Sequence, residues 1–153
     1  MKLKNILGGM AFASLLILLV LAVSQKDKMN QFVSSSLKNQ VSAEAKLAGQ
    51  ELIDSLYNYA ANGESYQLTF LEFGAEGCIS CRKMKKVMEE VKNHYPAKVN
   101  VVFMNALKEE SQQLMKMYGI ASIPTQILLD KKGKEFYRHS GYISFDDLSK
   151  EFH

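Results

Sequence analysis

The chain has 153 residues, of which 47% are hydrophobic and 23% are charged, a composition that excludes an intrinsically disordered protein. Lys2 and Lys4 precede the first apolar run, and the rest of the chain carries 17 basic against 16 acidic side chains. Because nucleic-acid binding needs a basic excess to neutralise phosphates, we expect no nucleic-acid partner. The two cysteines, three residues apart, are too few for a disulfide-stapled scaffold or a four-cysteine zinc site.

The N-terminus carries a strongly apolar segment. Residues 6–23 contain 15 apolar residues out of 18, and as a helix they would span about 27 Å, close to the ~30 Å hydrocarbon core of a membrane. Lysines ahead of such a run are typical of an export signal, and they keep the N-terminus on the cytoplasmic side. We therefore predict an N-terminal hydrophobic helix, with residues 1–24 acting as a signal anchor or a signal peptide. A buried core helix is the alternative.

The fate of this segment decides the predicted location. If it is retained, the chain is anchored in the inner membrane through residues 6–23, with the domain on the extracytoplasmic side. If a signal peptidase cleaves at the small residues 22–24, the domain is periplasmic. Both outcomes place the domain in an oxidising compartment, where a disulfide can persist. Residues 25–40 are rich in Ser, Gln, Asn and Lys and are predicted to be a polar tether, which leaves 41–153 as the folded domain.

Hydrophobic periodicity after residue 41 predicts four helices and four strands. The helices are expected at 42–61, 78–94, 108–118 and 145–152, and the strands at 66–73, 99–104, 125–129 and 134–139. Two strand–helix–strand crossovers imply parallel pairing of the first strands, and the turn at 130–133 adds an antiparallel hairpin. The predicted fold is α/β, with a four-stranded mixed sheet flanked by helices.

Two details of these elements can be compared directly with a structure. The first helix is expected to bury an apolar set at intervals of three and four: Val41, Ala45, Ala48, Leu52, Leu56 and Tyr59. The strands 66–73 and 99–104 read as buried strands, because their apolar residues do not alternate with polar ones.

The cysteine pair carries the clearest chemical signal. Cys78 follows a buried strand at the start of a helix, where unpaired backbone N–H groups and the helix dipole favour thiolate over thiol. Cys81 lies on the same helix face, so the Cα atoms should be roughly 5–6 Å apart, within disulfide range. A sulfur at the helix tip is exposed and one a turn deeper is shielded, so we expect Cys78 as nucleophile and Cys81 as resolving thiol. Half of a metal site and an inert structural bridge are the alternatives.

Glu72 is an unusual residue in an otherwise apolar strand, six positions before Cys78. If buried, its carboxyl faces a desolvation penalty that raises its pKa, which would make it a proton acceptor for Cys81. The alternative is a side chain that points into a solvated gap beside the strand.

A proline precedes the strand 125–129. Proline cannot donate a hydrogen bond to a sheet, so Pro124 belongs at the first position of a strand. A cis bond between Ile123 and Pro124 would expose the Ile123 backbone beside the cysteines, where an extended substrate could pair with it. An ordinary trans turn proline is the alternative.

Together these residues resemble the thioredoxin family. The resemblance covers about residues 45–152 and is carried by segments 70–91 and 118–142 and by the strand between them. It implies a thioredoxin fold and dithiol–disulfide exchange without a bound cofactor or metal. It maps the two active cysteines to Cys78 and Cys81 and the buried acid to Glu72. The implied substrate-binding residues are Ile123, the cis-proline Pro124, Thr125 and Gly141.

The sequence departs from thioredoxin at three places. Gly77 stands where a tryptophan usually precedes the first cysteine, Ile79-Ser80 replaces the usual Gly-Pro, and the usual first strand is missing. The chain looks like the exported thioredoxin-like proteins of bacterial envelopes. That resemblance implies a membrane thiol-electron carrier as donor, and oxidised proteins such as apocytochrome c as substrates. Because the dipeptide 79–80 adds no charge to favour the thiolate, we predict a reductant.

Two functions of other classes remain open from the residues alone. Two thiolates suit Cu(I), so a metallochaperone on the same scaffold is one alternative, although no third ligand is evident. A non-catalytic thioredoxin-like adaptor, in which the cysteines are incidental, is the other.

Overall fold

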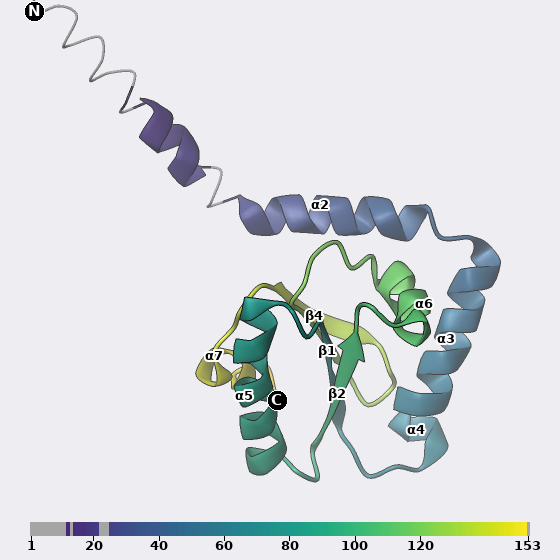
Figure 1. Ribbon diagram of the computed structural model, residues 1–153. Coiled ribbons are helices and arrows are strands. Elements are labelled where there is room, and N and C mark those ends of the chain that lie inside the picture. The colour runs from purple at the N-terminus through teal and green to yellow at the C-terminus, as the bar shows by residue number, and fades with distance from the viewer. Residues whose placement is uncertain (1–11, 13, 22–24, 153) are drawn as a thin grey trace, which may run out of the picture.

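The computed structural model describes residues 12, 14–21 and 25–152 (Figure 1). The helices are α2 (Lys26–Asn39), α3 (Ala43–Tyr57), α4 (Tyr59–Asn62), α5 (Ile79–His94), α6 (Glu109–Tyr118) and α7 (Phe145–Ser149). The strands are β1 (Leu68–Gly74), β2 (Val99–Asn105), β3 (Thr125–Leu129) and β4 (Glu135–Ser140). They form one sheet in the order β2-β1-β3-β4, in which β1 and β2 are parallel and the other two pairs are antiparallel. The predicted four-stranded mixed sheet is confirmed. The parallel pairing expected from the second crossover is wrong, because α6 returns the chain in the opposite direction and β3 runs antiparallel to β1.

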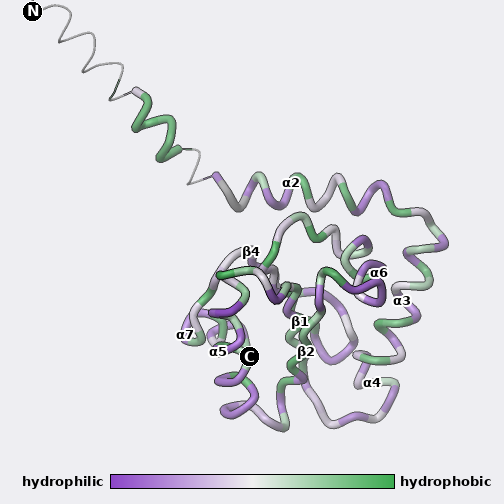
Figure 2. The backbone as a smooth tube through the Cα atoms, in the orientation of Figure 1, coloured by the Kyte–Doolittle hydropathy of each residue, from purple (hydrophilic) through white to green (hydrophobic). Residues whose placement is uncertain are grey.

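Strand β1 lies at the centre and divides the core into two layers. All seven of its residues are buried. Phe70 packs with residues of α5 and α7 on one face, whereas Leu71 packs with residues of α3 and α6 on the other. Figure 1 shows α5 and α7 on one side of the sheet and α3, α4 and α6 on the opposite side, and Figure 2 shows hydrophobic residues concentrated in β1 and β2 between them. The continuous apolar run of β1 follows from this burial on both faces.

The first predicted helix differs from the structure in two ways. A single helix was expected over 42–61, but the backbone breaks at Asn58, which forms an isolated bridge with Lys132. The buried face is also rotated by about one residue, because Gly49, Ile53 and Tyr57 are buried whereas Leu56 is exposed. Gly49 lies against α6: a Cβ at this position would lie 2.6 Å from Met117 Sδ, so the glycine brings α3 close to the Met117 side chain. The periodicity alone does not reveal this close approach.

Strand β2 is less buried than its sequence indicates. Val99 is buried, but the next residues are only partly covered, and Phe103 is 38% exposed. The reason is topological: β2 is an edge of the sheet, because no strand lies on its other side within the described residues.

Residues predicted as a polar tether form helix α2, and one face of it lies against the domain. Ser34 is buried; its hydroxyl donates to the Tyr118 carbonyl at 3.2 Å and accepts from Arg138 at 2.8 Å. Lys38 pairs with Glu135 at 3.2 Å, and Glu135 also binds Arg138 at 2.7 Å. Burial raises the pKa of Glu135, but these two cations outweigh it and hold the pKa below its usual value. Polar contacts rather than an apolar stripe therefore hold α2.

Half of the predicted N-terminal hydrophobic helix lies outside the described residues, which omit 6–11, 13 and 22–23 of that segment. Residues 14–21 are helical, and their large apolar side chains are exposed, as in Ile17 and Leu18. In the described part of the chain, no helix has both the length and the apolar character that are needed to cross a membrane.

Gly119 provides a test of how α2 is held. Its φ of +58° is in the left-handed region, and a Cβ there would overlap the carbonyl oxygen of Ser34 in α2. Gly63 is the matched control, because its φ is +81° but a Cβ would meet nothing within 4 Å. Gly63→Ala should therefore cost only the backbone strain of about 1–2 kcal/mol. Gly119→Ala should lower the free energy of unfolding further and make α2 more sensitive to trypsin. Equal losses in the two variants would contradict the docking of α2.

Candidate active site

The two cysteines form a disulfide at the start of α5. Their Cα atoms are 5.2 Å apart, which agrees with the separation expected from the helical spacing. Cys78 is the N-cap residue of α5, and its Sγ accepts a hydrogen bond from the backbone N–H of Cys81 at 3.2 Å. The sulfur therefore lies against the unpaired N–H groups of the helix terminus, where negative charge is stabilised. This arrangement can favour a thiolate at Cys78 once the disulfide is reduced.

The two sulfurs differ in exposure. Cys78 is partly exposed, whereas Cys81 is buried, with 4% of its surface accessible. This is the asymmetry that exchange chemistry needs, because an incoming disulfide can reach the outer sulfur while the inner one stays protected until it displaces the partner.

Gly74 was missed as a site residue. A Cβ at this position would lie 3.4 Å from both the Cβ and the Sγ of Cys81 and 3.0 Å from the Phe103 ring. Glycine at the end of β1 therefore lets the start of α5 pack closely on the sheet. A glycine at the end of a buried strand is a signal of close backbone approach that sequence reasoning could have used.

Glu72 is buried, with 1% of its surface exposed, so the solvated-gap alternative does not hold. Burial raises the pKa of Glu72 to about 8, although a hydrogen bond from Gln126 acts in the opposite direction. The Gln126 Nε2 atom donates to Glu72 Oε2 at 3.0 Å. Sequence reasoning also missed this glutamine. Its signal is similar to that of Glu72: a large polar side chain beside the apolar residues of a buried strand.

Strand periodicity places Glu72 on the same face as the cysteines. Side chains at 70, 72 and 74 share one face of β1. Phe70 packs with the buried face of α5, and position 74 abuts Cys81. Glu72 lies between them, so its carboxyl occupies the next position beneath Cys81 on the α5 side of the sheet.

The proline loop meets the site from β3. The Ile123–Pro124 bond is cis, and Pro124 is buried beside the partly exposed Ile123. Phe73 pairs with Thr125, so extending the antiparallel register by one step puts Pro124 opposite Gly74, which abuts Cys81. Gly141 donates its backbone N–H to the Pro124 carbonyl at 2.8 Å. The structure thus brings Pro124, Thr125 and Gly141 to the end of the sheet that holds the cysteines.

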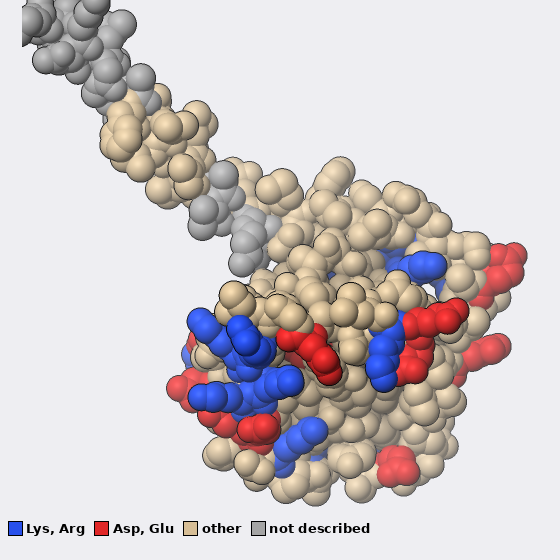
Figure 3. All heavy atoms as spheres, viewed as in Figure 1, with Lys and Arg blue, Asp and Glu red and all other residues tan. Residues whose placement is uncertain are grey.

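The surface around the cysteines is basic on the α5 side. Lys and Arg side chains gather over α5 (Figure 3), and the residues concerned include Arg82, Lys83, Lys85 and Lys86. Lys83 lies over the Tyr142 ring, 5.8 Å from its centroid. Ile79, between the cysteines, is 67% exposed, so an apolar residue lies next to the disulfide.

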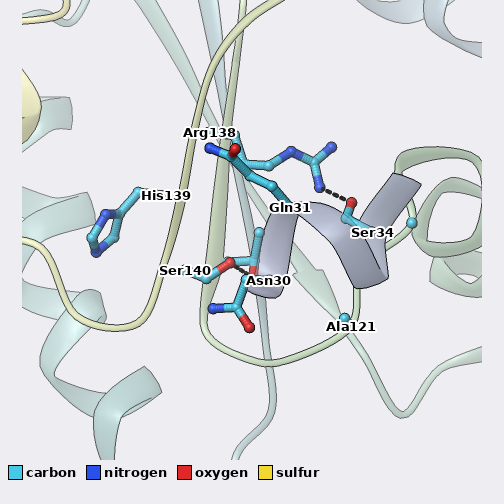
Figure 4. A pocket seen from close by; sticks show the side chains of 9 residues that line it. Asn30, Gln31, Ser34, Ala121, Arg138, His139 and Ser140 are labelled. Atoms are coloured by element: carbon cyan, nitrogen blue, oxygen red, sulfur yellow. Dashed lines mark hydrogen bonds between the residues drawn. The ribbon is translucent and has the colours of Figure 1, made fainter. Parts of the chain in front are cut away.

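Helix α2 forms part of a small polar pocket next to the proline loop. The pocket has a volume of about 150 Å³, and its lining includes Asn30 and Gln31 from α2 together with Thr125 and Ser140. Figure 4 shows Asn30 beside Ser140 and the Arg138 guanidinium bonded to Ser34, while His139 points away. The prediction of residues 25–40 as a tether gave no indication that α2 lines this pocket.

Among the residues that the structure covers, no three His, Cys, Asp or Glu side chains gather as a metal site.

Fold and site together define a thioredoxin-type α/β domain with a C-x-x-C pair at a helix N-terminus. The sequence profile of the thioredoxin-like domain family matches residues 54–153, so the chain belongs to that family.

Individual relatives agree with this assignment. The chain is 37% identical to thioredoxin from Rickettsia bellii over 65 residues, which cover 42% of this chain and 59% of the relative. It is 35% identical to thioredoxin 1 from Nostoc sp. over 80 residues, which cover 52% of this chain and 72% of the relative. The solved exposed lipoprotein thioredoxin of Streptococcus pneumoniae matches in fold, with a TM-score of 0.51 and 20% identity, over 59% of this chain and 86% of that one.

The raised pKa of Glu72 makes stability depend on pH. The native carboxyl holds its proton up to about pH 8, whereas the unfolded chain releases it near 4.5. Unfolding therefore releases a proton between these values, and stability should fall by roughly 1 kcal/mol for each pH unit as pH rises through this window. Glu72→Gln should remove this dependence. Urea unfolding of the oxidised protein from pH 4.5 to 8 measures it, and identical slopes for the variant and the wild type would show that Glu72 is not responsible.

Proposed function

We propose that this protein is a thiol–disulfide oxidoreductase of the bacterial cell envelope that reduces disulfides in protein substrates through Cys78 and Cys81. The observation that carries the proposal is the pair itself: a disulfide at the N-terminus of α5, with one sulfur partly exposed and the other buried. Membership of the thioredoxin-like family supports the reaction type.

The first step uses the reduced protein. The Cys78 thiolate attacks one sulfur of a substrate disulfide; the substrate S–S bond breaks, a bond between Cys78 and that sulfur forms, and one substrate thiolate leaves and takes up a proton. Hydrogen bonding from the backbone N–H of Cys81 and the helix dipole favour the attacking thiolate. Partial exposure of Cys78 gives the substrate access.

The second step releases the substrate. Cys81 transfers its proton to the Glu72 carboxylate, and the resulting thiolate attacks Cys78 Sγ. The mixed disulfide breaks, the second substrate sulfur leaves as a thiolate and takes up a proton, and the Cys78–Cys81 disulfide forms, so two electrons have passed to the substrate. A pKa of about 8 for Glu72 lies near that of an ordinary thiol, which suits transfer of a proton between the two groups. A membrane dithiol carrier then reduces the disulfide by the reverse exchange.

The cis-proline loop is the proposed contact for the polypeptide substrate. Ile123, Pro124 and Thr125 present backbone next to the cysteines, and an extended segment of the substrate can pair with it as an added strand. The hydrogen bond from Gly141 to the Pro124 carbonyl fixes the loop on β4.

An envelope location and a reductant role are supported by different features. The location rests on the apolar segment 6–23 behind Lys2 and Lys4, with residues 1–24 kept as an anchor or cleaved. The reductant role rests on the dipeptide Ile79-Ser80, which adds no charge to stabilise the Cys78 thiolate. Electron donation by a membrane thiol carrier and delivery to oxidised proteins such as apocytochrome c would complete the cycle.

The division of roles between the cysteines can be tested by trapping. Wild-type protein should reduce insulin with dithiothreitol as electron donor, and Cys78→Ser should abolish this activity. Cys81→Ser should accumulate mixed disulfides on Cys78, because the thiol that releases the substrate is absent. Trapping by Cys78→Ser instead would reverse the roles.

The same trapping variant tests the location. Mixed disulfides trapped by Cys81→Ser in cells should contain extracytoplasmic proteins and, if the anchor is retained, should sediment with membranes. Cytoplasmic partners would contradict the envelope location.

The direction of electron flow can be tested by equilibration with glutathione. The potential should lie nearer the roughly −270 mV of thioredoxin than the roughly −120 mV of strong periplasmic oxidants. Ser80→His is a matched variant that adds a charge-stabilising group beside Cys78, and it should make the potential less negative. A wild-type value near −120 mV would overturn the reductant role.

A further inference from the structure

Strand β3 contains a polar residue that the exchange reaction described above does not use. Gln126 is completely buried, and its neighbours along the strand, Ile127 to Leu129, are apolar and also completely buried. A buried amide destabilises a protein unless its donors and acceptors are paired. Its presence in the middle of the core therefore calls for a specific partner.

That partner is Glu72. The two residues are directly opposite in the β1–β3 register, and the Gln126 amide donates to Glu72 Oε2 at 3.0 Å. Two acceptors of the pair, Glu72 Oε1 and Gln126 Oε1, have no hydrogen-bond partner within the described part of the chain. A proton on Glu72 would turn one of these two unpaired acceptors into a donor, which favours a neutral carboxyl in the oxidised protein.

The surroundings of Glu72 contain few other groups that could respond to its charge. The buried face of α5 presents Cys81, Met84, Val87, Met88 and Val91. The basic side chains of α5 are exposed, as are Asp146 and Asp147 on α7, and β2 places Phe103 opposite Glu72. Within the described residues, the hydrogen bond from Gln126 is the one contact that favours the ionised carboxyl.

We propose that Gln126 is a positioning residue for proton transfer between Cys81 and Glu72: its amide holds the carboxyl on the α5 side of the sheet and stabilises the negative charge that the carboxyl carries before it accepts the proton of Cys81. This inference rests on the proposed exchange reaction. A neutral amide suits the task, because it favours the carboxylate less strongly than a buried cation would and leaves the carboxyl able to take up a proton. Gln126 does not touch the sulfurs or the substrate in this proposal and acts only through Glu72.

The direct test is the titration of Glu72 in the oxidised protein, followed by NMR of the ¹³C-labelled glutamate side-chain carboxyl. Glu72→Gln identifies the signal. Gln126→Met removes the amide at similar volume and should raise the titration midpoint by about one pH unit or more, because the carboxylate loses its donor. Leu128→Met is the matched control, since Leu128 lies on the same face of β3 and has no polar atom; its midpoint should be that of the wild type. Gln126→Leu provides a second variant if Gln126→Met does not fold.

A kinetic measurement separates positioning from simple packing. The release of a peptide disulfide-linked to Cys78 should show a pH profile that moves to higher pH in Gln126→Met. The same substitution in a Glu72→Gln background should leave the profile unchanged. An unchanged carboxyl midpoint in Gln126→Met, or an equal kinetic shift in both backgrounds, would overturn the role of Gln126. If the midpoint moves as expected but wild-type protein does not reduce insulin, the exchange reaction itself is wrong, and the inference fails with it for that separate reason.

Discussion

The site depends on the close contact between the end of β1 and the first turn of α5. Because Gly74 has no side chain, Cys81 packs directly against the sheet, and Cys78 is left at the exposed tip of the helix. The same strand carries Glu72 one side-chain position below, on the face that α5 covers. A Cβ at position 74 would touch Cys81 and would lie 3.0 Å from the Phe103 ring, so a larger side chain there would press on the inner sulfur and on that ring.

Strands β3 and β4 provide the remaining parts of the site, which are the partner of Glu72 and the cis-proline loop. β3 begins directly after the cis-proline and brings Gln126 to Glu72, and Gly141, which follows β4, donates a hydrogen bond to the Pro124 carbonyl. Neutral hydrogen-bond donors stabilise the negative charges of this region. The backbone N–H of Cys81 donates to the outer sulfur, and the Gln126 amide donates to the Glu72 carboxyl. The cations of α5 stay at the surface, where solvent screens them. In the proposed exchange reaction, a proton can therefore pass between Cys81 and Glu72 with neutral hydrogen-bond donors, rather than a fixed charge, beside them.

Helix α2 extends the structure beyond the part of the chain that matches the family profile, which begins at residue 54. It is held by Ser34, Lys38, Glu135 and Arg138, and it lies next to the loop that leads to the cis-proline. Its residues therefore contribute to the surface beside the site, although they were predicted as a tether. The apolar residues of α2, such as Met29 and Phe32, are exposed, so their spacing does not indicate the face that docks. The partners that hold the helix lie about a hundred residues away in sequence.

Local pattern determined the order of the elements, the mixed sheet, the Cα–Cα distance of the cysteines and the buried stripe of α5. Strand and helix periods, and the i, i+3 spacing on one helical turn, are properties of neighbouring residues. The sequence also singled out Glu72 as anomalous. Only the tertiary structure decided that Glu72 faces Cys81 rather than solvent, that Gln126 is its partner, and that α3 is rotated toward Gly49. All three features depend on which faces of strands and helices pack against each other. A contact between segments that are distant in sequence does not change the hydrophobic pattern of either segment, so the pattern cannot predict it.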